Sequence, residues 1–164
     1  MQLGQIGIWR SRNRGSAAAA AEIEALGYGA LWIGGSPSVE QARPYLAASS
    51  TLPVITGILN VWQHDPADVA AAHAELTHDY PDRFLLGIGI GHPEATSDYR
   101  RPLKTMREFF DGLDAAETPV PKHERLAAAL GPKMLDLSKE RSLGTHPYFT
   151  PLEHTRFEIG RAHV

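Results

Sequence analysis

Short apolar runs alternate with helix-like segments along the whole chain, and this alternation limits its possible folds more than any other feature. Each run is bounded by turn residues and is followed by a segment whose apolar residues have helical spacing. The runs that we interpret as strands cover residues 5–9, 30–34, 53–62, 84–90, 126–130 and 146–149. Two of them, VITGIL and FLLGIGI, are almost continuously apolar, which is typical of parallel strands covered on both faces. The alternation therefore predicts a parallel sheet built from βα units.

The first two expected helices have recognisable ends or interruptions. An alanine-rich helix over residues 16–26 ends at Gly27, which suits the left-handed position that follows a helix. A short helix over residues 38–49 is disturbed at Pro44, because proline lacks the backbone donor that a helix interior needs.

Four more helices are expected further along the chain. Asp65 and Pro66 suit the cap and first turn of a third helix, which ends before Pro81. A fifth helix is expected over residues 132–140, and a sixth begins at the capping box that starts at Thr150. The fourth helix carries an apolar stripe made of Tyr99, Leu103, Met106, Phe110 and Leu113.

Two architectures are compatible with this alternation, and they differ in strand order. In a (β/α)8 TIM barrel neighbouring strands follow one another in the chain, whereas an open doubly wound sheet reverses its order. A complete barrel needs about 250 residues, or about 31 for each βα unit, so 164 residues hold five units and a fraction. We therefore expect a partial (β/α)8 TIM barrel of about six βα units with sequential parallel strands. The alternative is an open doubly wound α/β binding module without a redox role.

The composition excludes several classes of protein. The chain contains no cysteine, which excludes a disulfide scaffold, a thiolate metal site and a cysteine nucleophile. The formal charge is −3 with both signs interspersed, which gives no electrostatic footprint for nucleic acid. No apolar run approaches the roughly 18 residues of a membrane span, and residues 1–5 are too short and polar for a signal peptide. We expect a cytoplasmic protein whose partner is a small-molecule substrate, not nucleic acid or membrane; a homo-oligomer stays open.

The carboxyl ends of the expected strands are rich in glycine and aromatic residues. In both architectures ligands bind at these ends. They carry few paired carboxylates, which general acid–base hydrolysis requires. Glycine lets the backbone approach a ligand closely, so this composition favours a flat ring system lying against the main chain. The simpler interpretation, that these glycines only make tight turns, stays open on the residues alone.

Three well-known motifs are not supported by the residues. In the dinucleotide-binding pattern a helix follows the glycines directly, whereas here Pro93 follows Gly91 closely and no helix begins there. His73 and His78 are five residues apart and do not share a helix face as zinc-binding histidines do. No G-x-S-x-G elbow surrounds a serine. We therefore expect no metal site and leave the catalytic residue unassigned.

Six ordered segments carry a family resemblance across residues 3–156. They are GQIGIW, ALGYGALWIGG, LPVITGILNVWQHDP, RFLLGIGIGHPE, LAAALGPKML and GTHPYFTPLEHT. Taken together they resemble the bacterial luciferase-like monooxygenase family, and more narrowly its F420-dependent oxidoreductase subgroup. The resemblance implies a (β/α)8 barrel that holds coenzyme F420, or FMN as the alternative, at the carboxyl ends of its strands. It also implies hydride transfer between this coenzyme and an unknown small organic substrate.

The same resemblance implies which residues hold the coenzyme. In several family members the third strand carries a bulge with a non-prolyl cis peptide that supports one face of the ring. The matching stretch here is Gly57, Ile58, Leu59 and Asn60. The further implied contacts are Gly89 and Gly91 near the ring or its ribityl chain, and Gly131 and His146 on the chain and phosphate side.

The substrate side is less closely matched to the family. Candidates for its wall are Trp9, Trp62 and His92. At the end of the second strand many F420 enzymes have an acidic residue and a histidine, whereas this chain has Gly34, Gly35 and Ser36. The proton donor therefore has no assigned residue.

The resemblance stops near Arg156, and the last residues, EIGRAHV, resemble the translation of a sequencing adapter. We expect residues 1–157 to form an incomplete luciferase-like barrel domain and residues 158–164 to be a non-native tail; the alternative is a natural short variant with a divergent tail. A barrel without its last strands exposes two unpaired sheet edges, which promotes association. We therefore expect the chain to be insoluble or oligomeric, to bind no coenzyme tightly, and to be inactive as this fragment.

Overall fold

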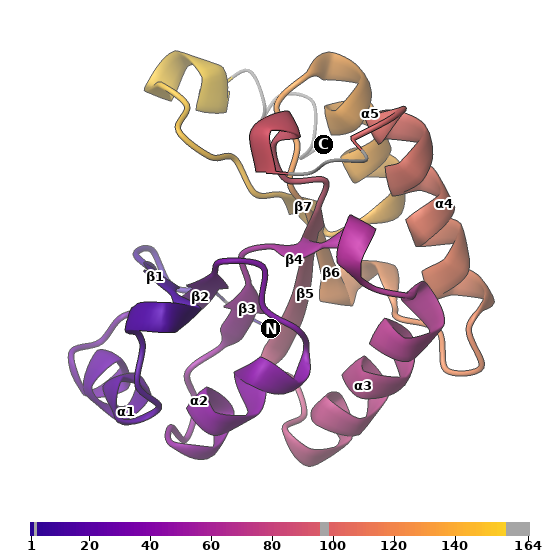
Figure 1. The fold of residues 1–164 in the computed structure, drawn as a ribbon. Helices are drawn as coiled ribbons and strands as arrows, with labels where there is room; N and C mark the ends of the chain where they lie inside the picture. Colours follow the sequence, from indigo (N-terminus) through magenta and orange to yellow (C-terminus); the bar gives the residue numbers. More distant parts are fainter. Residues whose placement is uncertain (2, 96–98, 157–164) are drawn as a thin grey trace.

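The strands lie side by side in chain order in the computed structural model, which describes residues 1, 3–95 and 99–156 (Figure 1). They are β1 (Ile8–Ser11), β2 (Leu31–Gly34), β3 (Val54–Thr56), β4 (Leu59–Asn60), β5 (Phe84–Gly89), β6 (Arg125–Ala127) and β7 (Gly144–Thr145). The order is β1-β2-β3-β5-β6-β7, with β4 paired to β5, and every pairing is parallel. Within the described residues no strand reverses this order. The sequential order is confirmed, and the doubly wound sheet is wrong.

Helices connect successive strands and follow an arc around the sheet in Figure 1. They are α1 (Ala18–Ala25), α2 (Arg43–Ala47), α3 (Pro66–Asp79), α4 (Pro102–Ala115) and α5 (Pro132–Arg141). Short 3-10 turns occur at η1 (Arg12–Arg14), η2 (Glu40–Ala42), η3 (Val61–Gln63), η4 (Pro93–Ala95) and η5 (Lys122–Glu124). Residues 152–156 are helical again, close to the expected start of a sixth helix. In the part of the chain that the structure describes, no helix has the length and apolar character needed to cross a bilayer. Residues 158–164, the expected tail, lie outside the described residues.

The first and last strands border one space, so the sheet curls. A cavity of about 430 Å³ is lined by Gly7 and Trp9 at β1, Trp32 of β2, Leu126 of β6 and Thr145 of β7. In a flat sheet, at about 4.8 Å per strand, β1 and β7 would be about 24 Å apart. Side chains from both could not then line a space of this size. The sheet is therefore a partial barrel, and this cavity lies on its inner face.

Apolar side chains cover both faces of the sheet. On the inner face Ala30, Ile55, Leu85 and Leu126, from neighbouring strand positions, form one cluster with Trp32. The larger cluster lies between the outer face and the helices, and its buried members include Leu46, Val69, Leu86, Met106, Phe110 and Leu137. Such double coverage explains why the strands read as continuous apolar runs and not as strict alternation.

The single strand expected at residues 53–62 is two strands separated by a break. β3 ends at Thr56, whose hydroxyl donates to the Gly87 carbonyl and accepts from the Gly87 N–H, both at 2.8 Å. A side chain therefore occupies the backbone groups of β5 that the next residue of a continuous strand would use. The chain passes through Gly57 and Ile58 and rejoins β5 as β4.

Three other strands differ from their expected bounds. The strand expected at residues 146–149 lies two residues earlier, as β7, because Pro147 has no backbone N–H to donate to a ladder. The strands expected at residues 5–9 and 126–130 are β1 and β6, which overlap those ranges only in part.

The apolar stripe of the fourth helix is confirmed, except at its first residue. Met106, Phe110 and Leu113 are buried in α4. Tyr99 lies before this helix, which begins at Pro102, so the helical spacing of Tyr99 with the stripe is coincidental.

Local signals at the ends of the other helices are confirmed. Gly27 has a φ of +80° just beyond α1. An oxygen of the Asp65 side chain accepts from the Ala67 N–H at 2.8 Å and caps α3. The helix expected at residues 38–49 is divided into η2 and α2, with Pro44 in the first turn of α2.

The carboxylate of Glu24 ties α1 to the loop that leads into β3. It accepts hydrogen bonds from the backbone N–H groups of Ser50, Thr51 and Leu52, and from the Thr51 hydroxyl. These bonds favour the ionised form and lower the pKa of Glu24 to about 2.

We predict that Glu24→Gln destabilises the fold at neutral pH and not in strong acid. A capping carboxylate at the surface contributes about 1 kcal/mol. Its contribution is complete above the ordinary pKa of 4.5 and is lost as the pH falls toward the folded value of about 2. Urea denaturation should show the difference from wild type at pH 7 and its disappearance near pH 2. Glu22→Gln, on the exposed side of α1, is the matched control, and a pH-independent difference for Glu24→Gln would contradict the prediction.

Candidate functional site

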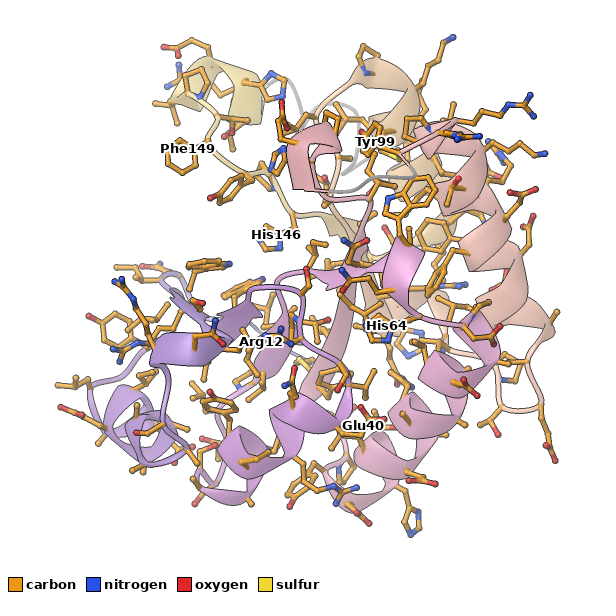
Figure 2. The ribbon with its side chains drawn as sticks, viewed as in Figure 1. Arg12, Glu40, His64, Tyr99, His146 and Phe149 are labelled. Carbon is orange, nitrogen blue, oxygen red and sulfur yellow. The ribbon has the colours of Figure 1, made fainter. Side chains whose placement is uncertain are left out.

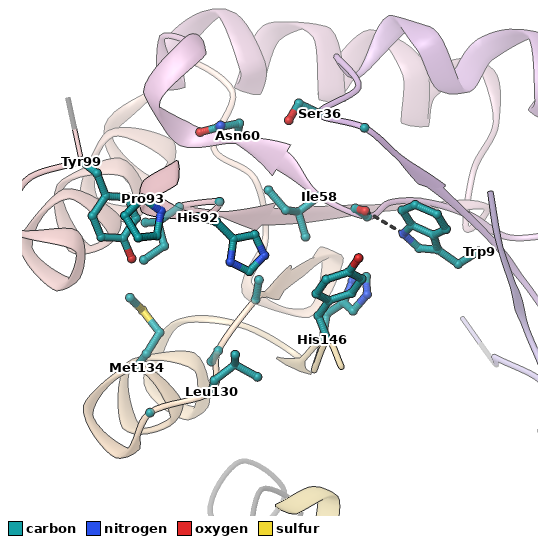
Figure 3. Close-up of a pocket in the computed structure, with 18 residues that line it drawn as sticks. Trp9, Ser36, Ile58, Asn60, His92, Pro93, Tyr99, Leu130, Met134 and His146 are labelled. Atoms are coloured by element: carbon teal, nitrogen blue, oxygen red, sulfur yellow. Dashed lines mark hydrogen bonds between the residues drawn. The ribbon is translucent and has the colours of Figure 1, made fainter. Parts of the chain in front are cut away.

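A cavity of about 470 Å³ lies at the carboxyl ends of the strands (Figure 3). Its volume falls within the range of small-molecule and cofactor sites, about 300–1,000 Å³. The residues that line it come from the ends of β1 to β4 and from the segments that follow β5, β6 and β7. They are Trp9, Gly35, Ser36, Gly57, Ile58, Asn60, Ile90, Gly91, His92, Pro93, Tyr99, Ala128, Ala129, Leu130, Gly131, Met134, His146 and Tyr148.

One wall of the cavity is the peptide between Gly57 and Ile58, which is cis, as the family resemblance implies. This peptide lies in the break between β3 and β4. A Cβ on Gly57 would lie 3.0 Å from Cε1 of His146 and 3.1 Å from Cδ1 of Trp32. The backbone of Gly57 is thus closely enclosed on the side away from Ile58.

Asn60 offers a hydrogen-bond donor beside this wall. The side chain is only 5% exposed, and its Oδ1 accepts from the Trp62 N–H at 3.1 Å. Because the oxygen is already bonded, the NH2 group is what this side chain can offer to a ligand.

His146 stands between this cavity and the one on the inner face of the sheet, since it lines both. Its ring packs edge-on against Trp32, with 6.2 Å between centroids. Burial lowers the pKa of His146 below its usual value, so the imidazole is neutral at pH 7. Its buried Nδ1 has no hydrogen-bond partner among the described residues.

Apart from its two histidines, the described lining of the cavity has no acidic or basic side chain: it contains no aspartate, glutamate, lysine or arginine. Burial and the nearby Glu94 raise the pKa of Tyr99, so its hydroxyl stays protonated. Figure 2 shows Tyr99 and His146 on the same side of the sheet; Phe149, 93% exposed, is not among the residues that line the cavity. The site therefore presents neutral hydrogen-bonding groups on an apolar wall.

The structure brings most of the residues expected at the site around this one cavity. They are Trp9, Gly57, Ile58, Asn60, Gly91, His92, Gly131 and His146. Within the described residues no three histidine or acidic side chains gather as metal ligands.

Two of the expected coenzyme contacts lie behind the wall. Leu59 is fully buried in the core, because successive side chains of a strand point to opposite faces and Asn60 takes the cavity side. Gly89 lies beneath Ile58, and a Cβ there would be 2.8 Å from the Ala128 Cβ.

Trp62, expected on the substrate side, also lies behind the lining. It packs against the outer core cluster and against Tyr99, with 5.9 Å between ring centroids. Its indole N–H donates to the Ile90 carbonyl at 2.8 Å. Trp62 therefore supports the lining and does not form it.

Several lining residues were not among those expected from sequence. Gly35 and Ser36 have φ values of +83° and +54°, and the glycine pair at the end of β2 is the only signal for them. Tyr99 and Met134 come from outside the strand ends. Helical spacing places both on helices, so the sequence carries no signal for their position at the site.

A family model described as luciferase-like monooxygenase matches residues 11–163. The chain belongs to this family. Among curated proteins no significant match was found.

Solved structures share the luciferase-like fold over nearly the whole chain. The coenzyme F420 dependent tetrahydromethanopterin reductase from Methanopyrus kandleri has a TM-score of 0.74 at 16% identity, over 98% of this chain and 60% of that one. An F420-dependent secondary alcohol dehydrogenase in complex with an F420-acetone adduct gives 0.73 at 14%, over 98% and 65%. The FMN complex of the oxygenating constituent of 3,6-diketocamphane monooxygenase from Pseudomonas putida gives 0.70 at 14%, over 98% and 62%.

At these identities the likeness shows the fold alone, and it confirms the expected partial barrel. The chain spans 60% to 65% of the length of these luciferase-like proteins.

We predict that Gly89→Ser destabilises the fold, because the new side chain must displace Ala128 or push Ile58 into the cavity. Overpacking of this kind costs about 1–3 kcal/mol, which chemical denaturation measures directly. The control is Gly131→Ser, the same change at the cap of α5, where an added Cβ meets nothing within 4 Å. Equal denaturation midpoints for the two variants would show that the position beneath Ile58 is not tightly packed.

Proposed function

We propose that the cavity binds the flat ring of coenzyme F420, with FMN as the alternative. We further propose that the protein is an oxidoreductase that transfers hydride between this coenzyme and a small organic substrate. One observation supports the proposal above all. A cavity without carboxylate, lysine or arginine in its described lining lies at the strand ends, with the Gly57–Ile58 peptide as one wall and Asn60 as a hydrogen-bond donor. Family membership and the F420-dependent solved neighbours also support the proposal.

The residues fit such a ring in shape and polarity. Ile58 offers apolar surface to one ring face, and Gly91, which also lines the cavity, has no side chain to keep a ring from the backbone. The NH2 group of Asn60 can donate to a carbonyl oxygen on the pyrimidine edge that both coenzymes have. A lining without formal charge suits an aromatic ring, because a buried charge there would need a partner of its own.

When bound, the coenzyme ring supplies the hydride chemistry that side chains lack. The residues of this chain bind and orient the ring and keep water from the face that lies on Ile58. They also hold two proton-carrying groups at the cavity. His146 is neutral because burial lowers its pKa, and Tyr99 is protonated because its pKa is raised.

The oxidoreductase activity is proposed for the whole protein and the ring site for this chain, which spans 60% to 65% of its solved neighbours. We propose that this chain alone binds the ring with a dissociation constant above about 1 µM, and that it has no turnover. In the described part β1 and β7 each pair on one side only, and Ile6 and Trp9 are 66% and 47% exposed. Such edges favour self-association as a homo-oligomer.

Titration with F420 and with FMN, followed by NMR shifts of the lining residues, tests the proposal. We predict that Asn60→Asp weakens binding about tenfold, because the carboxylate can still accept from the Trp62 N–H but replaces the amide donor with a negative charge. Asn13→Asp makes the same change on exposed η1 and should bind as wild type does. If wild type shows no shifts at the cavity with either coenzyme at millimolar concentration, the proposed function is wrong.

A further inference from the structure

The indole of Trp9 reaches across a neighbouring strand to the wall of the cavity. Its Nε1–H donates to the Gly57 carbonyl oxygen at 2.9 Å, the dashed line in Figure 3. Trp9 belongs to β1, which pairs with β2, whereas Gly57 follows β3 on the far side of β2. The side chain is 47% exposed, so burial alone does not hold it in this position. The hydrogen bond gives the ring its direction.

The indole of Trp9 lies over Gly34, the last residue of β2, which has no side chain. A Cβ on Gly34 would lie 1.9 Å from Cζ2 of Trp9, so any side chain at this position would displace the ring. The bond from Trp9 to Gly57 therefore requires that position 34 has no side chain.

Both backbone polar groups of Gly57 are tied, each by a different strand. Its N–H donates to the Ile33 carbonyl of β2 at 2.7 Å, and its carbonyl accepts from Trp9 of β1. The Gly57 carbonyl belongs to the peptide group that continues into Ile58. Because a peptide group is planar and contains the N and Cα of Ile58, a bond to this oxygen restricts the plane from which the Ile58 side chain leaves the backbone.

We propose that Trp9 is a positioning residue for the ring site. Its indole N–H holds the Gly57 carbonyl so that Ile58 presents its side chain to the bound ring. The proposal rests on the proposed function for the identity of the ring. The assigned role differs from a substrate wall, because Trp9 acts through the backbone of Gly57 and not through contact with a substrate.

Trp9→Phe tests this role, since it keeps an aromatic ring in β1 and removes the N–H donor, together with part of the ring surface. Trp32→Phe is the matched control. Trp32 is the register partner of Trp9 in β2, and its ring also lies beside Gly57.

Gly34→Ala is a second test, because it displaces the indole while leaving Trp9 in the chain. The measurements are the ¹³C shift of the Gly57 carbonyl and the methyl shifts of Ile58 without ligand, the dissociation constants for F420 and FMN, and the thermal midpoint.

We expect Trp9→Phe and Gly34→Ala to move the Gly57 and Ile58 resonances and to weaken coenzyme binding about five- to tenfold, the effect of one hydrogen bond. Trp32→Phe should keep the dissociation constants within about twofold of wild type, even if it lowers the thermal midpoint as much as Trp9→Phe does. The proposal is overturned if Trp9→Phe binds as wild type does, or if Trp32→Phe loses as much affinity. If wild type binds neither coenzyme, the proposed function fails. Unmoved Gly57 and Ile58 resonances in Trp9→Phe overturn the positioning role itself, so the two failures are distinguishable.

Discussion

The two hydrogen bonds between the Thr56 hydroxyl and the backbone of Gly87 determine where the third strand leaves the sheet, and the cavity depends on that point. Both bonds are 2.8 Å long, and Thr56 is fully buried. Position 87 accepts only glycine, because a Cβ there would lie 1.9 Å from the Thr56 carbonyl oxygen. Since a side chain occupies these groups of β5, Gly57 and Ile58 leave the ladder and form the wall before β4 resumes it. One buried hydroxyl thus produces both the strand break and the site.

Once the backbone leaves the ladder, its carbonyl groups need other donors. Two indoles supply them: Trp9 donates to Gly57 and Trp62 donates to Ile90, which lines the cavity next to Gly91. An indole N–H is a donor only, so it suits a carbonyl at a strand end that has lost its neighbour. Trp9 and Trp62, near the strand ends, therefore hold the backbone of the site by hydrogen bonds.

Much of the fold follows from patterns that depend on local chemistry. The strand order follows from the alternation of elements, and the helix ends follow from Asp65, Pro44 and Gly27. Spacing alone does not predict the break after Thr56, because threonine in an apolar run reads as an ordinary strand residue; only the family resemblance, which implies a bulge at residues 57–60, indicates it. The bond of Thr56 to Gly87 joins positions that are 31 residues apart.

At the site, the strand ends identified the right segments but not the direction of each side chain. Leu59 and Asn60 are neighbours with opposite roles: Leu59 is buried in the core and Asn60 lines the cavity, and the family resemblance did not distinguish them. Tyr99 and Met134 enter the cavity from outside the strands, so a search confined to strand ends misses them. The resemblance to the family located the cis peptide that spacing alone does not reveal.

Charged side chains hold the amino ends of the strands, opposite the cavity. Glu24 binds the loop before β3, Arg83 directly precedes β5 and donates to Ser49 Oγ at 2.7 Å, and Arg125 at the start of β6 pairs with Asp114. A buried charge in the cavity would need an opposite charge and hydrogen bonds. The polar side chains that line the cavity would then bond to that charge and could not bond to a ligand. The charged contacts at the amino ends and the hydrogen-bonding groups of the cavity therefore come from largely different residues, although Arg12 also donates to the Ser36 carbonyl at the cavity.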